Sequence, residues 1–95
     1  KVRLLPFGEA EVNRLAVSSG GGSIGLLYSA QAAGADLLIT GEASHPIYHA
    51  AKEMGINLVL AGHYATETWG VRSLMPLLER EFSVSTRFVD FPTHF

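Results

Sequence analysis

Two patterns of apolar and polar residues follow one another several times along the chain. Short apolar runs end in glycine, and each is followed by a stretch in which apolar residues recur every three or four positions, as on one face of a helix. This pattern predicts strands at 12–17, 35–40, 57–61 and 84–91, and helices from 24 to just before Gly34, from His45 to just before Gly55, and over about 66–82.

Strands that alternate with helices predict right-handed crossovers and a mostly parallel sheet. The expected fold class is therefore α/β, with one domain over residues 1–95, about four to five strands, and helices on both faces of the sheet. The last helix is expected to turn its apolar side chains inward, namely Trp69, Leu74, Leu77 and Leu78.

Composition narrows the class of protein. Hydrophobic residues make up 47% of the 95 residues and the formal net charge is −2, which is typical of an ordered globular domain. The seven Lys and Arg residues are scattered, which argues against nucleic acid or an anionic membrane as a partner. No apolar run approaches the roughly 20 residues that cross a bilayer, so we expect a cytoplasmic protein. The first residue is Lys1 rather than methionine, which is typical of a piece of a longer polypeptide.

Three loops follow three of the predicted strands: SSGGGS, TGEASH and GHYATE. Because the carboxyl ends of parallel strands meet at the same edge of a sheet, we expect these loops to converge there. Convergence of three separated segments predicts a binding or active site at that edge.

The third loop carries His63 and Glu67, an imidazole and a carboxylate that could bind one cation. With no cysteine in the chain, such N and O ligands suit zinc, iron or manganese. The alternative is a helix cap formed by Thr66 or His63, and spacing does not decide between the two. Two ligands are too few for a catalytic zinc, so further donors must come from other side chains or from outside the chain, the candidates within it being Glu42, His45 and His49.

The glycine run admits two other interpretations. Gly20, Gly22 and Gly25 match the G-x-G-x-x-G pattern, and Glu42 follows at the distance of a ribose-binding acid. Against a dinucleotide site, the chain is too short for both halves of such a domain. The glycines could equally relieve crowding before a helix capped by Ser23, or form a cradle of amides for an anion.

Four segments taken together resemble a known family: AVSSGGGS, GADLLITGE followed by SH, GINLVLAGHYATE and FVDFPT. They are similar to the carboxyl-terminal part of the NGG-interacting-factor-three-like family over about residues 13–93. These proteins are also called dinuclear metal centre proteins, and many carry the name GTP cyclohydrolase I type 2. The resemblance implies one lobe of a two-lobed α/β protein with a pair of divalent metals between lobes, often assembled as a ring-shaped hexamer. By this likeness His63 and Glu67 match the metal ligands of the second lobe, and the other ligands, a histidine pair and an aspartate, belong to an amino-terminal lobe that this sequence lacks.

The expected function is that of a metal-binding lobe of a metal-dependent hydrolase that acts on a nucleotide or phosphate-ester-like substrate. His63 and Glu67 would hold a divalent ion (zinc, iron, manganese or magnesium), and Glu42 would orient His63 or transfer a proton. Substrate contacts are expected from the three loops, namely Ser19, Gly20, Gly22, Ser23, Thr40, His45 and Tyr64. The alternatives are a ligand-binding or oligomerisation module without catalysis and a dinucleotide-binding domain.

Overall fold

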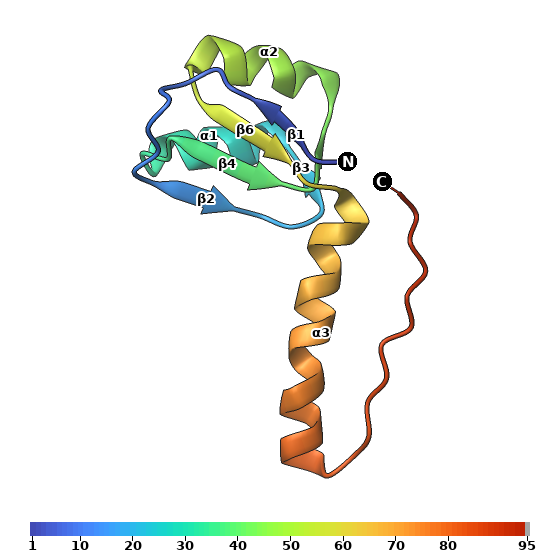
Figure 1. Ribbon diagram of the computed structural model, residues 1–95. Helices are drawn as coiled ribbons and strands as arrows, with labels where there is room; N and C mark the ends of the chain where they lie inside the picture. The colour runs from blue at the N-terminus through green and yellow to red at the C-terminus, as the bar shows by residue number, and fades with distance from the viewer. Residues whose placement is uncertain (95) are drawn as a thin grey trace.

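The computed structural model describes residues 1–94, and Figure 1 shows how its elements are arranged. The strands and two of the helices pack together in layers, and the third helix projects away from them. In chain order the elements are β1 (Arg3–Leu5), β2 (Leu15–Val17), β3 (Gly21–Gly22), α1 (Ile24–Ala32), β4 (Leu37–Thr40), β5 (Glu42–Ala43), α2 (His45–Met54), β6 (Asn57–Leu60) and α3 (His63–Phe82).

The main sheet has four strands in the order β1-β6-β4-β2. β2, β4 and β6 are parallel, and β1 pairs with β6 in the antiparallel direction. The α/β class and the mostly parallel sheet are therefore confirmed. The antiparallel edge strand β1 was not predicted, because its three residues carry too short a pattern. β3 and β5 form a separate two-stranded parallel ladder at the end of β4.

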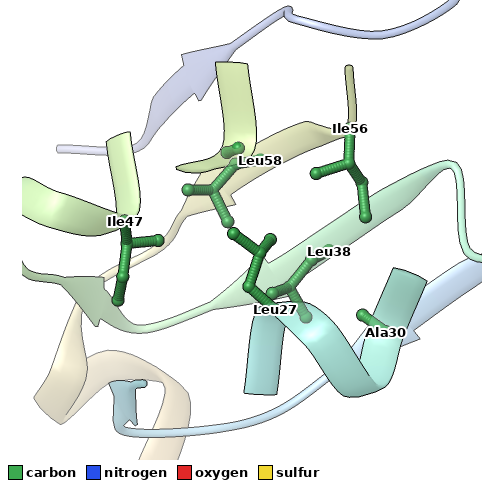
Figure 2. Close-up of a cluster of buried hydrophobic side chains, with 7 residues drawn as sticks. Leu27, Ala30, Leu38, Ile47, Ile56 and Leu58 are labelled. Atoms are coloured by element: carbon green, nitrogen blue, oxygen red, sulfur yellow. The ribbon is translucent and has the colours of Figure 1, made fainter. Parts of the chain in front are cut away.

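α1 and α2 pack against the same face of the sheet (Figure 2). Leu27 of α1 and Ala51 of α2 are fully buried against Leu38 of β4 and Leu58 of β6. The expectation of helices on both faces is thus wrong for residues 1–94. The strands β2, β4 and β6 are added in one direction across the sheet, so two right-handed crossovers place both helices on one side.

The opposite face of the sheet is apolar and largely uncovered. The register aligns Leu4, Val59, Ile39 and Val17 in one row across the four strands. At the two ends of this row Leu4 is 60% exposed and Val17 is 70% exposed. Alternation along each strand therefore gives two apolar faces, as in strands buried on both sides, although only one face has helices over it.

α3 projects away from the sheet instead of packing on it (Figure 1), and none of its residues is buried. The inward orientation predicted for its apolar side chains is wrong: Trp69, for example, is 71% exposed and Leu74 is 51% exposed, and Leu77 and Leu78 are also exposed. The periodicity correctly predicted a helix, but periodicity alone does not predict whether the apolar face of a helix packs on the core. The projection raises the radius of gyration to 15.8 Å, against about 12 Å for a compact domain of this length.

No helix within residues 1–94 is long and apolar enough to cross a membrane.

The chain after α3 runs back along that helix (Figure 1). The strand predicted at 84–91 is wrong, because residues 83–94 form no strand. Side chains hold this segment instead: Thr86 donates its hydroxyl to Glu79 (2.6 Å), and the Arg72 guanidinium lies 5.1 Å from the centre of the Phe88 ring. We call residues 84–94 the return segment.

Leu58 offers a test of the core. Leu58→Ala should lower the free energy of unfolding by about 2–5 kcal/mol, because it leaves a cavity between the sheet and the helices. Urea denaturation followed by circular dichroism measures the loss. Leu74→Ala on the exposed side of α3 is the matched control and should change stability by less than about 1 kcal/mol. Equal losses in both variants would contradict this location of the core.

Candidate functional site

The three loops predicted to converge do meet at the carboxyl edge of the parallel strands. Backbone hydrogen bonds join them: the Glu42 amide donates to the Gly20 carbonyl (3.0 Å), and the Gly62 amide donates to the Gly41 carbonyl (2.8 Å). The Gly20 amide donates to the hydroxyl of Thr66 (2.9 Å) in the first turns of α3. The edge is therefore held together by the loops themselves, and the start of α3 is part of it.

Two glycines allow this close approach. A Cβ at position 41 would clash with the Gly20 carbonyl oxygen and lie 2.7 Å from the Thr66 hydroxyl oxygen. Gly20 has a φ of +72°, which favours glycine, and a Cβ there would lie 2.5 Å from a carboxylate oxygen of Glu67. Glycine is therefore required at position 41 by the packing of the edge and favoured at position 20 by the backbone conformation.

His63 lies between two carboxylates. Its Nδ1 is 2.6 Å from Oε1 of Glu42, and its Nε2 is 3.1 Å from Oε1 of Glu67. α3 begins at His63, three residues earlier than predicted, so His63 and Glu67 are one helical turn apart on the same face. The N-cap residue is Gly62, which has no side chain to cap the helix, so the capping interpretation of this segment does not apply. We call Glu42, His63 and Glu67 the imidazole–carboxylate cluster.

The cluster is partly open to solvent and changes the proton affinity of its histidine. The exposed fractions of the side chains are 36% for His63, 46% for Glu42 and 56% for Glu67. The hydrogen bond with Glu42 raises the pKa of His63 above its ordinary value, and the negative charge of Glu67 adds to this effect while desolvation opposes it. The site therefore favours a positive charge at the imidazole.

The cluster has the donor chemistry of half a metal site. Zinc bonds to histidine nitrogen and to carboxylate oxygen are about 2.0–2.2 Å long, so two ligands of one tetrahedral ion lie roughly 3.3–3.6 Å apart. Nε2 of His63 and Oε1 of Glu67 are 3.1 Å apart, so a small separation of the two side chains would bring them to the distance of two zinc ligands. Glu42 contacts the other nitrogen, so the three side chains do not converge on one point. Consistently, within residues 1–94 no group of three or more His, Cys, Asp or Glu side chains is arranged to hold a metal ion.

The other predicted substrate contacts are spread over the edge. Ser23 caps α1 by accepting a hydrogen bond from the Leu26 amide (3.1 Å). This agrees with the interpretation in which the glycine run precedes a helix capped by Ser23. Thr40 is 1% exposed and lies beneath Gly22, with no hydrogen-bond partner for its hydroxyl within residues 1–94. Ser19 is exposed on the first loop. Gly22 pairs with Ala43 in the β3–β5 ladder, so the glycine run is partly extended strand.

His45 and Tyr64 point to different surroundings. His45 lies on α2 with its ring 5.0 Å from that of His49, centre to centre, and it is not part of the imidazole–carboxylate cluster. The hydroxyl of Tyr64 donates to Asp90 (2.6 Å) and accepts from the Phe91 amide (2.8 Å). The Asp90 hydrogen bond also raises the pKa of Tyr64. Its hydroxyl is thus engaged by the return segment.

The return segment reaches the site, which sequence reasoning missed. A cavity of about 360 Å³ beside the cluster is lined by Glu42, His63, Tyr64, Glu67 and Thr93. Thr93 is brought there by the two hydrogen bonds at Tyr64, a contact between residues more than 25 positions apart along the chain. The motif FVDFPT was visible in the sequence, but no local pattern connects it to Tyr64.

Comparison with known families identifies the fold. The sequence model of the Duf34/NIF3 (NGG1p interacting factor 3) family matches residues 1–94. The chain belongs to the Duf34/NIF3 family. Relatives named GTP cyclohydrolase 1 type 2 homolog are similar in sequence: the protein from Pyrococcus horikoshii is 48% identical over 92 residues, and that from Archaeoglobus fulgidus is 45% identical over 91. These alignments cover 97% and 96% of the chain but only 36% and 37% of the relatives, so the chain spans little more than a third of their length.

Solved structures in this Duf34/NIF3 group agree. Protein ybgI, described as of unknown function, has a TM-score of 0.89 and 34% identity over 100% of this chain and 38% of its own. TTHA1606 from Thermus thermophilus has a TM-score of 0.84 and 36% identity over 99% of this chain and 37% of its own. The resemblance predicted from the sequence motifs is confirmed.

The hydrogen bond between Glu42 and His63 can be tested by titration. Glu42→Gln should lower the pKa of His63, because the variant loses the negative partner at Nδ1. Since the folded pKa is raised, the stability that His63 contributes is present below the unfolded pKa of about 6.5 and is lost as pH rises through the folded pKa. NMR of the imidazole and thermal unfolding, both in chelator, measure the two effects.

The difference in melting temperature between the parent and Glu42→Gln should therefore shrink as pH is raised from about 6 toward 9. Glu53→Gln on α2 is a matched control and should leave the pKa of His63 unchanged. A pKa of His63 that is the same in the parent and in Glu42→Gln would contradict this role of Glu42.

Tyr64→Phe should release the end of the return segment while keeping the aromatic ring. The variant removes both hydrogen bonds of the hydroxyl, so exchange of the Phe91 amide hydrogen should accelerate by up to about tenfold. Hydrogen exchange followed by NMR measures this. Tyr28→Phe on α1 should have no such effect, and unchanged exchange at Phe91 in Tyr64→Phe would show that the segment is held by other contacts.

Proposed function

We propose that this chain is a metal-binding lobe whose His63 and Glu67 hold a divalent cation in a metal-dependent hydrolase. The observation that carries this proposal is the pair of carboxylates on the two nitrogens of one imidazole. A neutral imidazole has one N–H, so one of its nitrogens would face a carboxylate oxygen with a lone pair against a negative charge. That contact becomes favourable only with a cation, either a proton or a metal ion, between the two atoms.

Glu42 acts as a positioning residue in this proposal. The shorter contact, 2.6 Å, is at Nδ1, which is where a charge-assisted N–H donor to a carboxylate is expected. With its proton on Nδ1, His63 presents the lone pair of Nε2 toward Glu67. This is the arrangement in which a carboxylate fixes the tautomer of a metal-ligating histidine.

The chemistry follows from the ligands and the cavity beside them. A divalent ion held here would supply Lewis-acid activation of water or of a carbonyl or phosphoryl group. The chain's own residues would orient the imidazole through Glu42 and line the cavity through Tyr64 and Thr93. The family relatives named GTP cyclohydrolase 1 type 2 homolog support a nucleotide or phosphate-ester-like substrate as part of the proposal.

Two donors from this chain leave further ligand positions open, since catalytic zinc sites generally use three protein ligands. Water, another part of a longer polypeptide or another copy would complete the set. The assembly role considered from the sequence is favoured by a separate observation: α3 has no buried residue, and Trp69 on it is 71% exposed. Assembly and metal binding are compatible, because these apolar side chains lie outside the imidazole–carboxylate cluster.

Calorimetric titration with zinc or manganese tests the metal proposal. His63→Ala and Glu67→Ala should each lower the affinity by more than the roughly 10- to 100-fold that is typical of losing an outer partner, and Glu42→Gln should lower it within that range. His45→Ala is the matched imidazole control and should bind as the parent does. Equal affinity in the parent, His63→Ala and Glu67→Ala would overturn the proposal.

A further inference from the structure

Two neighbouring cavities share one wall on the α2 side of the edge strand. The first, of about 370 Å³, lies over Gly41, Glu42 and Gly62, and we call it the edge cavity. The second, of about 440 Å³, lies against α2 beside Ser44, Tyr48 and His49, and we call it the helix cavity. Both are lined by the same three residues, Arg3, Ala43 and Leu60, so they are direct neighbours, and we call the two cavities together the groove.

The helix cavity has an apolar base and a ring-bearing wall. Its base includes Leu58, which is fully buried, together with Leu5 and Leu60. Its wall is formed by Tyr48 and by the two histidines of α2, His45 and His49. An apolar base beside aromatic rings is the environment that a flat organic ring prefers.

Edge-to-face contacts hold this wall in place. The Tyr48 ring lies 5.1 Å from the Phe7 ring at 88° and 5.3 Å from the His49 ring at 81°, measured between ring centres and ring planes. The His49 ring in turn lies 5.0 Å from that of His45 at 84°. Because each ring is supported by the next, a ligand would find the wall largely formed, which lowers the entropy lost on binding.

The charge of the groove is positive on the side of Arg3. Arg3 makes no ion pair within residues 1–94, and its strand position is fixed by pairing with Leu60. No acidic side chain among the described residues lines the helix cavity, and the one that lines the edge cavity, Glu42, is engaged by His63. The Ser44 hydroxyl, which makes no capping hydrogen bond, also lines the helix cavity and can donate to an anion.

We infer that this groove is a binding site for a ligand that joins a flat ring to a phosphate group. Arg3 binds the phosphate with its planar fork of N–H donors, and Ser44 adds a hydrogen bond. The ring packs over Leu5 and Leu60 against Tyr48 and the histidine pair. His63 and Glu67 line neither cavity, so the site does not rest on the proposed metal pair. Arg3 is thus a binding residue that sequence patterning did not single out.

The test uses phenyl phosphate as the probe, with inorganic phosphate and phenol as its two halves, in calorimetric titrations with chelator present. The parent should bind phenyl phosphate more tightly than either half. Arg3→Gln should weaken binding at least about tenfold, because it removes the charged hydrogen-bond donor. Tyr48→Leu should weaken binding of phenyl phosphate but not of inorganic phosphate, and amide shifts at Ala43 and Leu60 should locate the probe in the groove.

Three matched variants separate this site from other effects. Arg87→Gln, on the return segment and outside both cavities, should bind as the parent does. Glu67→Ala removes one of the two proposed metal ligands but keeps the contact between Glu42 and His63, and it should also retain phenyl phosphate binding, so failure of the metal proposal and failure of this one can be told apart. Arg3→Lys keeps the charge without the planar fork and should bind with intermediate affinity. Binding that is unchanged in Arg3→Gln, undetectable in the parent, or equally tight for inorganic phosphate would overturn the inference.

Discussion

The close approach of three loops at Gly41 is the constraint on which the site depends. At this position the chain leaving β4 is packed between the Gly20 carbonyl on one side and the first turn of α3 on the other, with no room for a side chain. The hydrogen bonds from Glu42 to Gly20 and from Gly62 to Gly41 hold this junction. Because Glu42 and His63 each follow a strand within two or three residues, fixing the junction also fixes their separation. Any larger residue at position 41 would move the loops apart and open the contact between Glu42 and His63.

Much of the fold could be predicted because its strands are short apolar runs that end in glycine. That pattern located β2, β4 and β6 and the helices α1 and α2 to within a few residues, since each element is defined by its own local period. The pattern could not predict the order of the strands in the sheet. The one-directional order of β2, β4 and β6 is a tertiary choice, and it decides that both helices share a face. The same limit explains α3, whose amphipathic pattern correctly predicted a helix but incorrectly predicted that it packs on the core.

The candidate site also combines contacts that the local sequence pattern predicts with contacts that depend on the tertiary structure. His63 and Glu67 could be predicted because one helical turn separates them, and Glu42 because its loop ends a neighbouring parallel strand. The contact of Tyr64 with Asp90 could not be predicted, since nothing in the intervening 25 residues encodes the direction of the return segment. Arg3 was missed for a related reason: β1 is too short to show a period, and only its antiparallel pairing with β6 brings Arg3 beside Leu60 and α2. Large exposed apolar surfaces of the kind seen on α3 and on the open sheet face are typical of surfaces that contact another domain or copy.

The raised proton affinity of His63 and the proposed metal site have one electrostatic origin. With a neutral imidazole, Glu42 and Glu67 leave the cluster with two negative charges around a single ring. A proton on the imidazole neutralises one of these charges, whereas a divalent ion beside Nε2 neutralises both. The arrangement that raises the pKa of His63 therefore also favours a divalent cation, and the proton and the divalent cation compete for the same lone pair on Nε2.

Glu42 has opposite effects on this competition. Its charge attracts the proton to the ring, but its hydrogen bond at Nδ1 directs the remaining lone pair toward Glu67. A cluster built only for stability would gain little from that second effect in so exposed a position, since exposed ion pairs are worth about 0–1 kcal/mol. The orientation of Nε2 toward Glu67 therefore supports the proposed cation site and adds little to the stability of the fold.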